Sequence, residues 1–491
     1  MTRFGAVAYL AAIFLAFPVE ARQAPNEEEL RRHIAYLASD ALEGRRPGSI
    51  GEALSADYIA RHFAEIGLEP GYAEGYLDHV ELVDRRVGTI ALDWTHDGEI
   101  IRIDGDDVLG FGRGEIERFE DRPVVFLGFG RDLGDPDTTP IDLQGTVVLL
   151  LADRPGVEQG VGDYEERLRQ LAGRGVAAVI GIVQDEPGWA VVEETAGRGR
   201  AGLAETPMAP VELMLAPSAG ARLLEAAGYD FARLAQRTSA ADFEPALLPM
   251  RMSGEISTGV YPLTGHNVLA KLPGSGGGGD AVLYLAHHDH LGLCRPEGAA
   301  DRICNGAVDN ASGVAQLIEI AEGLASGEPP DRDIYFLATT AEELGLFGAR
   351  AFVDAPPLPL RHVVAAINLD TVATSPAGSR LTTVGRGMTP IDPVIALVAA
   401  QLGRANYEGE ELNTFVERQD GMILLDAGVP ALMVGGIRGV AFERFLVGPY
   451  HTPDDELTED TDLSGAAEDV VFHIALGRAL ADPESYRPPP R

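Results

Sequence analysis

Cysteine is nearly absent from this sequence. Only Cys294 and Cys304 occur among 491 residues, and both lie in one short loop. Two thiolates without neighbouring histidines supply half of a zinc site, so a zinc site built on cysteine is excluded. A disulfide that closes the loop remains an open alternative, and it would persist in an exported protein.

Basic residues are scarce as well. The chain has 39 lysines and arginines against 76 aspartates and glutamates, which gives a formal net charge of -37. A surface of this charge repels phosphate backbones, so we expect no nucleic acid partner. The simplest interpretation of the excess charge is that it keeps an exported protein soluble.

Long apolar runs are missing except at the start of the chain. Residues 5–17 (GAVAYLAAIFLAF) follow Arg3, and residues 19–21 (VEA) stand at the usual cleavage spacing. This pattern predicts a signal peptide over residues 1–21 and a periplasmic or secreted protein, with an uncleaved anchor as the alternative. Nothing later in the sequence resembles a membrane span, so stable membrane insertion is not expected.

The composition, 45% hydrophobic and 23% charged, is that of a globular protein, and the length predicts two or three domains. Helical periodicity covers residues 27–68 and is broken by a turn at 43–48. Residues 87–252 alternate short β-rich runs with turns, and we expect an inserted domain there. Residues 24–86 and 255–485 then form the main domain. Its strand–loop–helix alternation predicts an α/β three-layer sandwich around a mixed, mostly parallel sheet.

Ionisable residues follow the predicted strands of the main domain. In open α/β sheets, ligands bind beyond the carboxyl ends of the strands. The strand 281–286 precedes His287 to His290, the strand 334–339 precedes Glu342 and Glu343, and the strand 363–369 precedes Asp370. Imidazoles and carboxylates are ligands that zinc accepts, so the sequence predicts a metal site at this edge.

Asp309, before a predicted helix at 312–325, and His451, in a polar loop, extend this set. Each residue alone has an ordinary explanation: a capped turn before a helix, or acids at the start of a helix for Glu342 and Glu343. Together they supply two histidines and three carboxylates, enough for two metals that share a bridge. Such a pair polarises a carbonyl and activates water, and a further carboxylate acts as general base.

At this point the sequence resembles a known family. The motifs are AHHDH (286–290), GAVDNASG (306–313), AEELGLFGAR (341–350), INLD (367–370) and YHTPDD (450–455). In this order they resemble the co-catalytic two-zinc aminopeptidases, whose relatives include glutamate carboxypeptidase and the transferrin receptor. Residues 36–45 also match bacterial members, and residues 124–183 resemble the protease-associated insert of many members.

The resemblance implies a role for each position. Asp309 would bridge two zinc ions; His287 and Asp370 would complete the protein ligands of one ion, and Glu343 and His451 those of the other. Two further residues would act in catalysis: Glu342 would transfer the proton of the attacking water to the departing amine, and Asp289 would orient His287. The Asp309–Asn310 peptide would be cis, as in relatives.

Two positions depart from the family pattern. Val308 stands where many members have a second acid, although members like glutamate carboxypeptidase are also apolar there. Residues 419–421 (QDG) replace a Ser-Asp-His stretch, so a histidine that faces the substrate is missing. This departure affects the support of the oxyanion and the shape of the pocket.

The sequence favours an exported zinc aminopeptidase that acts on peptides. A dipeptidase or carboxypeptidase of the same family is the main alternative, with Arg438 and Arg444 as candidates to bind a terminal carboxylate. A non-catalytic receptor-like protein would be expected to have lost ligands, and all are present. A glutaminyl cyclase, with one metal, fits less well. Oligomeric state and residue specificity stay open.

Overall fold

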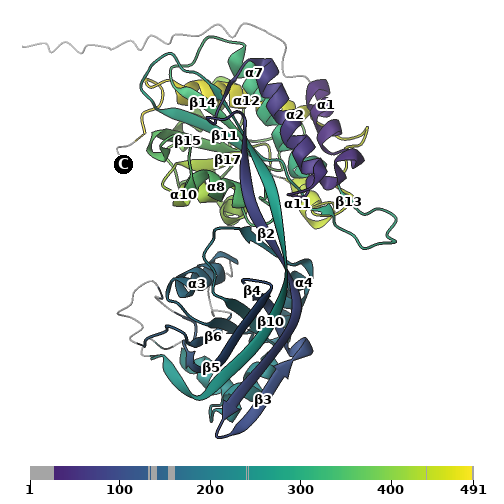
Figure 1. Ribbon diagram of the computed structural model, residues 1–491. Coiled ribbons are helices and arrows are strands. Elements are labelled where there is room, and N and C mark those ends of the chain that lie inside the picture. Colours follow the sequence, from purple (N-terminus) through teal and green to yellow (C-terminus); the bar gives the residue numbers. More distant parts are fainter. Residues whose placement is uncertain are drawn as a thin grey trace, which may run out of the picture.

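The computed structural model describes residues 27–130, 133, 141–152, 161–238, 240, 243–437 and 439–488. The predicted signal peptide lies outside these residues. Figure 1 shows two lobes, one above the other, which are joined by two long antiparallel strands, β2 (Leu77–His96) and β10 (Ala246–Leu272). Within the described residues, fifteen strands belong to one continuous sheet that runs through both lobes.

The upper lobe contains the α/β sandwich. Its strands are ordered β16-β17-β15-β11-β14-β10, with parallel pairing from β17 to β14 and antiparallel pairing at both ends. Besides β10, the strands of this lobe are β1 (Glu69–Pro70), β11 (Ala281–His287), β12 (Gly292–Leu293), β13 (Ile303–Cys304), β14 (Asp333–Thr339), β15 (Val363–Asn368), β16 (Thr382–Val384) and β17 (Ala431–Gly435).

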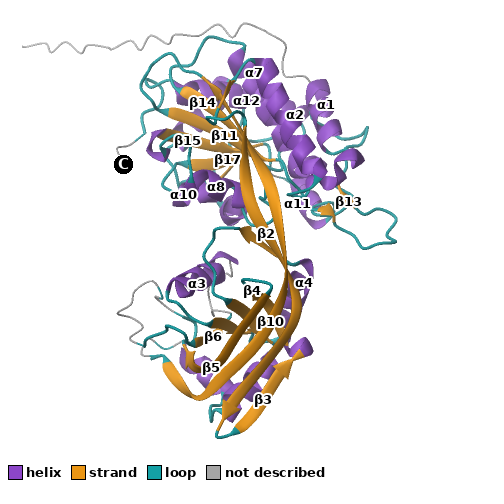
Figure 2. Ribbon diagram, viewed as in Figure 1, coloured by secondary structure: helices purple, strands orange, loops and turns teal. Residues whose placement is uncertain are grey.

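Helices cover both faces of this sheet (Figure 2). They are α1 (Glu27–Leu37), α2 (Ile50–Ile66), α7 (Ser312–Ala325), α8 (Phe347–Asp354), α9 (Asp392–Gln401), α10 (Gly421–Asp426), α11 (Val440–Val447) and α12 (Ser464–Ala481). Short 3-10 segments lie at Asp40–Arg45, Leu360–His362 and Glu411–Arg418, and a π-type turn at Ala307–Ala311.

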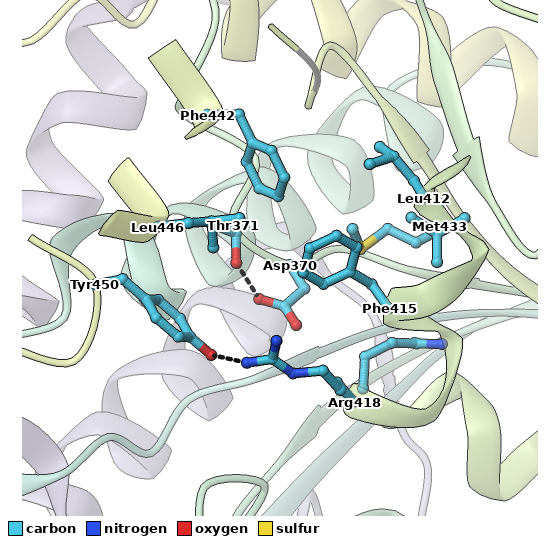
Figure 3. A pocket seen from close by; sticks show the side chains of 11 residues that line it. Asp370, Thr371, Leu412, Phe415, Arg418, Met433, Phe442, Leu446 and Tyr450 are labelled. Atoms are coloured by element: carbon cyan, nitrogen blue, oxygen red, sulfur yellow. Dashed lines mark hydrogen bonds between the residues drawn. The ribbon is translucent and has the colours of Figure 1, made fainter. Parts of the chain in front are cut away.

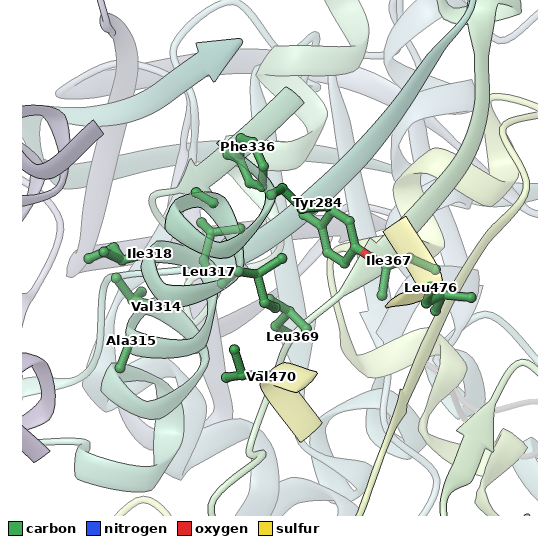
Figure 4. Packing of buried hydrophobic residues seen from close by; sticks show 14 of the residues in the cluster. Tyr284, Val314, Ala315, Leu317, Ile318, Phe336, Ile367, Leu369, Val470 and Leu476 are labelled. Atoms are coloured by element: carbon green, nitrogen blue, oxygen red, sulfur yellow. The ribbon is translucent and has the colours of Figure 1, made fainter. Parts of the chain in front are cut away.

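The burial of β11 shows how the sequence forms the layers. All seven of its residues are buried, and successive side chains point to opposite faces of the sheet. Val282 and Tyr284 pack in the cluster that includes α1, α2, α7 and α12, whereas Leu283 and Leu285 pack in the cluster with α8 and α10. Figure 4 shows Tyr284, Phe336 and Leu317 of α7 in the first cluster, where the ring centres of Tyr284 and Phe336 lie 6.1 Å apart. Burial on both faces explains why the strand is apolar throughout.

The lower lobe contains most of β2 and β10 and the residues between them. Its other strands are β3 (Glu99–Asp104), β4 (Val108–Gly112), β5 (Ile116–Phe126), β6 (Val147–Leu151), β7 (Ala178–Ile182), β8 (Arg200–Leu203) and β9 (Val211–Leu215), and its helices are α3 (Val161–Gly173), α4 (Glu186–Arg198), α5 (Pro217–Ala226) and α6 (Phe231–Thr238), with a 3-10 turn at Gly105–Asp107. Strands β5, β6, β7 and β9 pair in parallel. This lobe has its own apolar core.

The structure confirms the predicted mixed, mostly parallel sheet with helices on both faces. The proposed limits of the inserted domain, residues 87 and 252, fall inside β2 and β10, so the division at those residues stays a prediction. Cys294 and Cys304 form a disulfide beside β12 and β13. Within the described residues, no helix has the length and apolar character needed to cross a bilayer.

Candidate metal centre and pocket

The carboxyl ends of three neighbouring parallel strands carry the predicted site residues. His287 ends β11, Asp370 follows β15, and Glu342 and Glu343 follow β14. Asp309 lies in the π-type turn before α7, and His451 lies in the loop after α11. Five residues predicted as metal ligands are thereby brought together, although the chain places them 164 positions apart at the extremes.

Asp309 lies at the centre of this group. Its Oδ1 is 3.2 Å from Nε2 of His287, and its Oδ2 is 3.2 Å from Nε2 of His451. His287 Nε2 is also 3.6 Å from Oδ1 of Asp370, and His451 Nε2 is 3.2 Å from Oε2 of Glu343. One carboxylate therefore contacts two sets of potential ligands, which is the arrangement that a bridging ligand requires.

The charges of the group are strongly coupled. Burial acts to raise the pKa of Asp309, but the imidazoles of His287 and His451, each 3.2 Å away, outweigh it and lower the pKa. Burial acts to lower the pKa of His451, but the carboxylates of Asp309 and Glu343 raise it to about 10. The ionised form of these buried carboxylates is therefore stabilised by nearby positive charge.

A divalent cation fits this donor set. The potential ligand atoms of His287, Asp309 and Asp370 lie within 4.8 Å of one another, and so do those of His290, Asp309 and Glu343. Nε2 of His451 is buried and has no hydrogen-bond partner, although two carboxylates face it. Imidazole nitrogens and carboxylate oxygens in this number are suitable ligands for zinc.

The two predicted catalytic residues adjoin the group. Oδ1 of Asp289 accepts a hydrogen bond from the backbone N–H of Glu342 at 3.1 Å. Nδ1 of His287 lies 3.3 Å from the backbone carbonyl oxygen of Asp289 and 3.8 Å from the carboxylate of the same residue. Burial raises the pKa of Glu342 well above its usual range and that of Asp289 to about 8.

One local prediction was wrong. Glu342 and Glu343 do not open a helix: they lie in a turn, and α8 begins at Phe347. Ala341 and Leu346, on either side of this turn, have positive φ angles of 55° and 59°. Two left-handed residues within six positions prevent a helix from starting there, and such strained backbone is common at functional sites. The Asp309–Asn310 peptide is cis, as the resemblance implied.

Two residues beyond the predicted set, His290 and Asp455, support the group. His290 Nδ1 lies 2.6 Å from Oε1 of Glu343. Asp455 accepts hydrogen bonds from the backbone N–H groups of Val308 and Asp309, at 2.9 Å and 3.0 Å. His290 and Asp455 lie within the motifs AHHDH and YHTPDD, but only the fold shows which residues they contact.

The stretch that lacks the family histidine has a structural role. Gln419 Oε1 accepts hydrogen bonds from the side-chain amide of Asn368, at the end of β15, and from the backbone N–H of Gly421, both at 2.8 Å. Asp420 accepts a hydrogen bond from the hydroxyl of Thr339, at the end of β14. Burial raises the pKa of Asp420 to about 6. These two residues connect the strand ends that present the site.

A mostly apolar pocket adjoins Asp370 (Figure 3). Its lining residues are Asp370, Thr371, Val384, Leu412, Phe415, Arg418, Gln419, Met433, Phe442, Leu446 and Tyr450. Arg418 is exposed at this pocket, donates a long hydrogen bond of 3.4 Å to the Tyr450 hydroxyl and lies 5.5 Å from the centre of the Phe415 ring. Arg444 is exposed on α11 and does not line the pocket, and Arg438 lies outside the described residues.

Comparisons with known proteins agree with this geometry. Residues 267–475 match the model of peptidase family M28. The aminopeptidase YwaD of Bacillus subtilis (strain 168) is 29% identical over 191 residues, which cover 36% of this chain and 36% of that protein. The vacuolar membrane protease of Candida tropicalis is 33% identical over 92 residues, or 19% of this chain and 9% of that protein.

The chain therefore spans little more than a third of the first of these curated relatives and about a tenth of the second. An aminopeptidase structure from Aneurinibacillus sp. strain AM-1 superposes with a TM-score of 0.53 at 18% identity and covers 93% of this chain and 94% of that one, a likeness of fold. Together, the sheet, the ligand group and the matched model show that this chain contains a domain of peptidase family M28.

Proposed function

We propose that this protein is a zinc-dependent exopeptidase, an aminopeptidase that removes N-terminal residues from peptides. The observation that carries the proposal is the position of Asp309, whose two oxygens each lie 3.2 Å from a different imidazole. In this proposal Asp309 bridges two zinc ions. His287 and Asp370 complete the protein ligands of one ion, and Glu343 and His451 those of the other.

Zinc ions held by these residues would supply Lewis-acid chemistry, namely a polarised scissile carbonyl and a lower pKa of a water molecule. Glu342 accepts a proton from the attacking water and delivers it to the departing amine. Burial raises the pKa of Glu342 above its usual range. Asp289 keeps the Glu342 backbone in place and, in the proposal, orients His287.

The pocket beside Asp370 receives the side chain of the residue that is removed. Phe415, Met433, Phe442 and Leu446 give it an apolar lining, so a large apolar side chain is the preferred occupant. Leucyl and phenylalanyl anilides are then better substrates than aspartyl anilides, by a tenfold or greater ratio of kcat/KM.

The exposed guanidinium of Arg418 favours a second candidate, a dipeptidase or carboxypeptidase. This guanidinium contacts the Tyr450 hydroxyl at 3.4 Å and the Phe415 ring, and a guanidinium at the pocket suits a substrate carboxylate. Dipeptides with free and amidated C-termini separate the two functions. If amidation reduces kcat/KM by more than tenfold and Arg418→Gln removes this difference, the dipeptidase assignment replaces the first.

The experiment that tests the catalytic proposal uses purified chain loaded with zinc. Removal of metal with a chelator abolishes cleavage of amino-acyl anilides, and added zinc restores it. Glu342→Gln lowers kcat by about 10²–10⁴-fold while zinc content is unchanged. Glu417→Gln, an exposed acid of the same segment as Arg418, serves as the control and retains activity. Cleavage only of peptides with a blocked amine would sink the aminopeptidase assignment.

Two further elements of the proposal concern the whole chain. Export rests on residues 1–21 and is tested by N-terminal sequencing of the protein recovered outside the cytoplasm. The assignment of residues 87–252 as a protease-associated domain rests on the motifs of residues 124–183. A non-catalytic binding protein would bind zinc but show no cleavage in either the parent or the Glu342→Gln variant.

A further inference from the structure

A second group of possible metal ligands lies outside the peptidase site, between α1 and α7. Glu29 and His33 are four residues apart on α1, so they share one face of the helix. Both face Glu319 of α7, and one potential ligand atom from each of the three lies within 4.8 Å of the others. The side chains of His33 and Glu319 are only 2% and 9% exposed, whereas that of Glu29 is 36% exposed.

The orientation of His33 directs one ring nitrogen at Glu319. Its Nδ1 lies 2.8 Å from the hydroxyl of Tyr58, on α2, and its Nε2 lies 3.3 Å from Oε1 of Glu319. A hydrogen bond from an imidazolium to a carboxylate is shorter, about 2.7–2.9 Å. Two ligands on one tetrahedral zinc, each about 2.0 Å from the metal, lie about 3.3 Å apart. The imidazole–carboxylate pairs among the five predicted ligands of the peptidase site have a similar separation, 3.2 to 3.6 Å.

Glu319 gives a second, independent indication. Its Oε1 is buried and has no hydrogen-bond partner, although this atom faces the imidazole. A buried carboxylate oxygen without a donor is costly, and a cation between the two groups would remove that cost. Glu29 also forms an ion pair with Arg32, but that pair is at the surface, where such pairs contribute little.

We propose that Glu29, His33 and Glu319 bind one zinc ion, with water in the fourth position. An imidazole ligand favours zinc over calcium or magnesium, which prefer oxygen ligands alone. The ion connects α1 to α7, the helix that begins at Ser312, three residues after Asp309. Its role is structural, since binding to the folded chain stabilises that chain by mass action.

Zinc stoichiometry of the full-length chain tests this proposal. After equilibration with a zinc buffer, the parent protein contains one zinc per chain more than the variants His33→Leu and Glu29→Gln. Glu27→Gln removes the same charge from an exposed position of α1 and is the matched control, with unchanged zinc content. The zinc-dependent rise in thermal midpoint is also smaller in the two variants than in the control.

The difference of one zinc is independent of the peptidase site, because that site is unaltered in all four proteins. Specific activity of the zinc-loaded variants at low temperature therefore equals that of the parent. Equal zinc content in Glu29→Gln and Glu27→Gln would overturn the proposal, whatever the activity. If His33→Leu fails to fold, Glu29→Gln still decides, because Glu29 lies at the edge of the group and is partly exposed.

Discussion

Replacement of Arg45 by methionine is expected to destabilise the upper lobe strongly. Arg45 is fully buried, and its guanidinium donates to the backbone carbonyls of His288, Asn305 and Gly306 at 2.8, 2.6 and 3.0 Å, and also to that of Leu37. One side chain thereby connects the end of α1, the loop after β11 and the loop that precedes Asp309.

The magnitude follows from the acceptors that lose their donor. Each buried carbonyl left without a partner costs about 1–3 kcal/mol. The Gly306 carbonyl keeps the backbone N–H of Ala311 as a donor, so the other three give about 3 kcal/mol at the low end of the range. Methionine fills most of the space, so the cavity contribution is small. Burial lowers the pKa of Arg45 to about 10, and the side chain stays charged at neutral pH. Arg45→Lys keeps the charge with fewer donors, and we expect about half the loss.

Urea unfolding followed by two probes separates the loss of stability in the upper lobe, which contains Arg45, from that in the lower lobe. Trp94 and Trp189, the two tryptophans of the sequence, both lie in the lower lobe, so their fluorescence follows that lobe, whereas far-UV circular dichroism follows both. Arg45→Met lowers the midpoint seen by circular dichroism and leaves the tryptophan transition less changed. Arg46→Met is the control, since Arg46 is partly exposed and forms only a long ion pair of 3.4 Å. A loss below about 1 kcal/mol for Arg45→Met would refute the reasoning.

Three further predictions concern stability and metal binding. The double variant Cys294→Ser/Cys304→Ser loses about 2–3 kcal/mol of stability, because the disulfide closes a loop with a sequence separation of 10; thermal unfolding with and without reductant checks this. Asp455 accepts from the backbone N–H groups of Val308 and Asp309, and Asp455→Asn leaves one of these two groups without an acceptor. We expect the variant to bind zinc about 10–100-fold more weakly in a titration. Burial lowers the pKa of His473 to about 3, so the folded protein holds this imidazole neutral where the unfolded chain protonates it. The free energy of unfolding is therefore highest above the unfolded pKa of about 6.5. It falls by about 1.4 kcal/mol per pH unit as the pH drops from there toward 3. Relative to His473→Leu, parallel urea curves at pH 7, 6, 5 and 4 show that slope, and equal slopes for the two proteins would contradict it.

Patterns local in sequence were sufficient for much of the fold. The apolar run of residues 281–286 predicts β11, and the apolar face of residues 312–325 predicts α7, because both patterns depend only on neighbours along the chain. The order of the strand ends then predicts which side chains meet, since parallel strands present their carboxyl ends at one edge of the sheet. The meeting of His287, Glu343 and Asp370 was predictable for this reason, and their role as metal ligands stays a prediction.

Contacts over long sequence distances could not be predicted in the same way. Arg45 and its acceptor His288 are 243 positions apart in the sequence. Asp455 accepts a hydrogen bond from the backbone N–H of Asp309, which lies 146 positions away. A hydrogen bond to a carbonyl or a backbone N–H leaves no trace in the type of the partner residue. The lengths of β2 and β10 escaped prediction for a similar reason, because their half-buried segments pair with each other across both lobes.

These long-range contacts explain how α1 and the turn after it help to position the residues of the peptidase site. The apolar face of α1, at Leu30, Ile34 and Leu37, packs in the same core cluster as α7. Arg45 then anchors the following turn to the loops that carry His288 and precede Asp309. Because the positions of metal ligands must be held within a fraction of an ångström, a segment that contributes no predicted ligand to the peptidase site can still determine its geometry. A zinc ion between α1 and α7 would reinforce this connection at the end of α1 that lies farther from Arg45 along the chain.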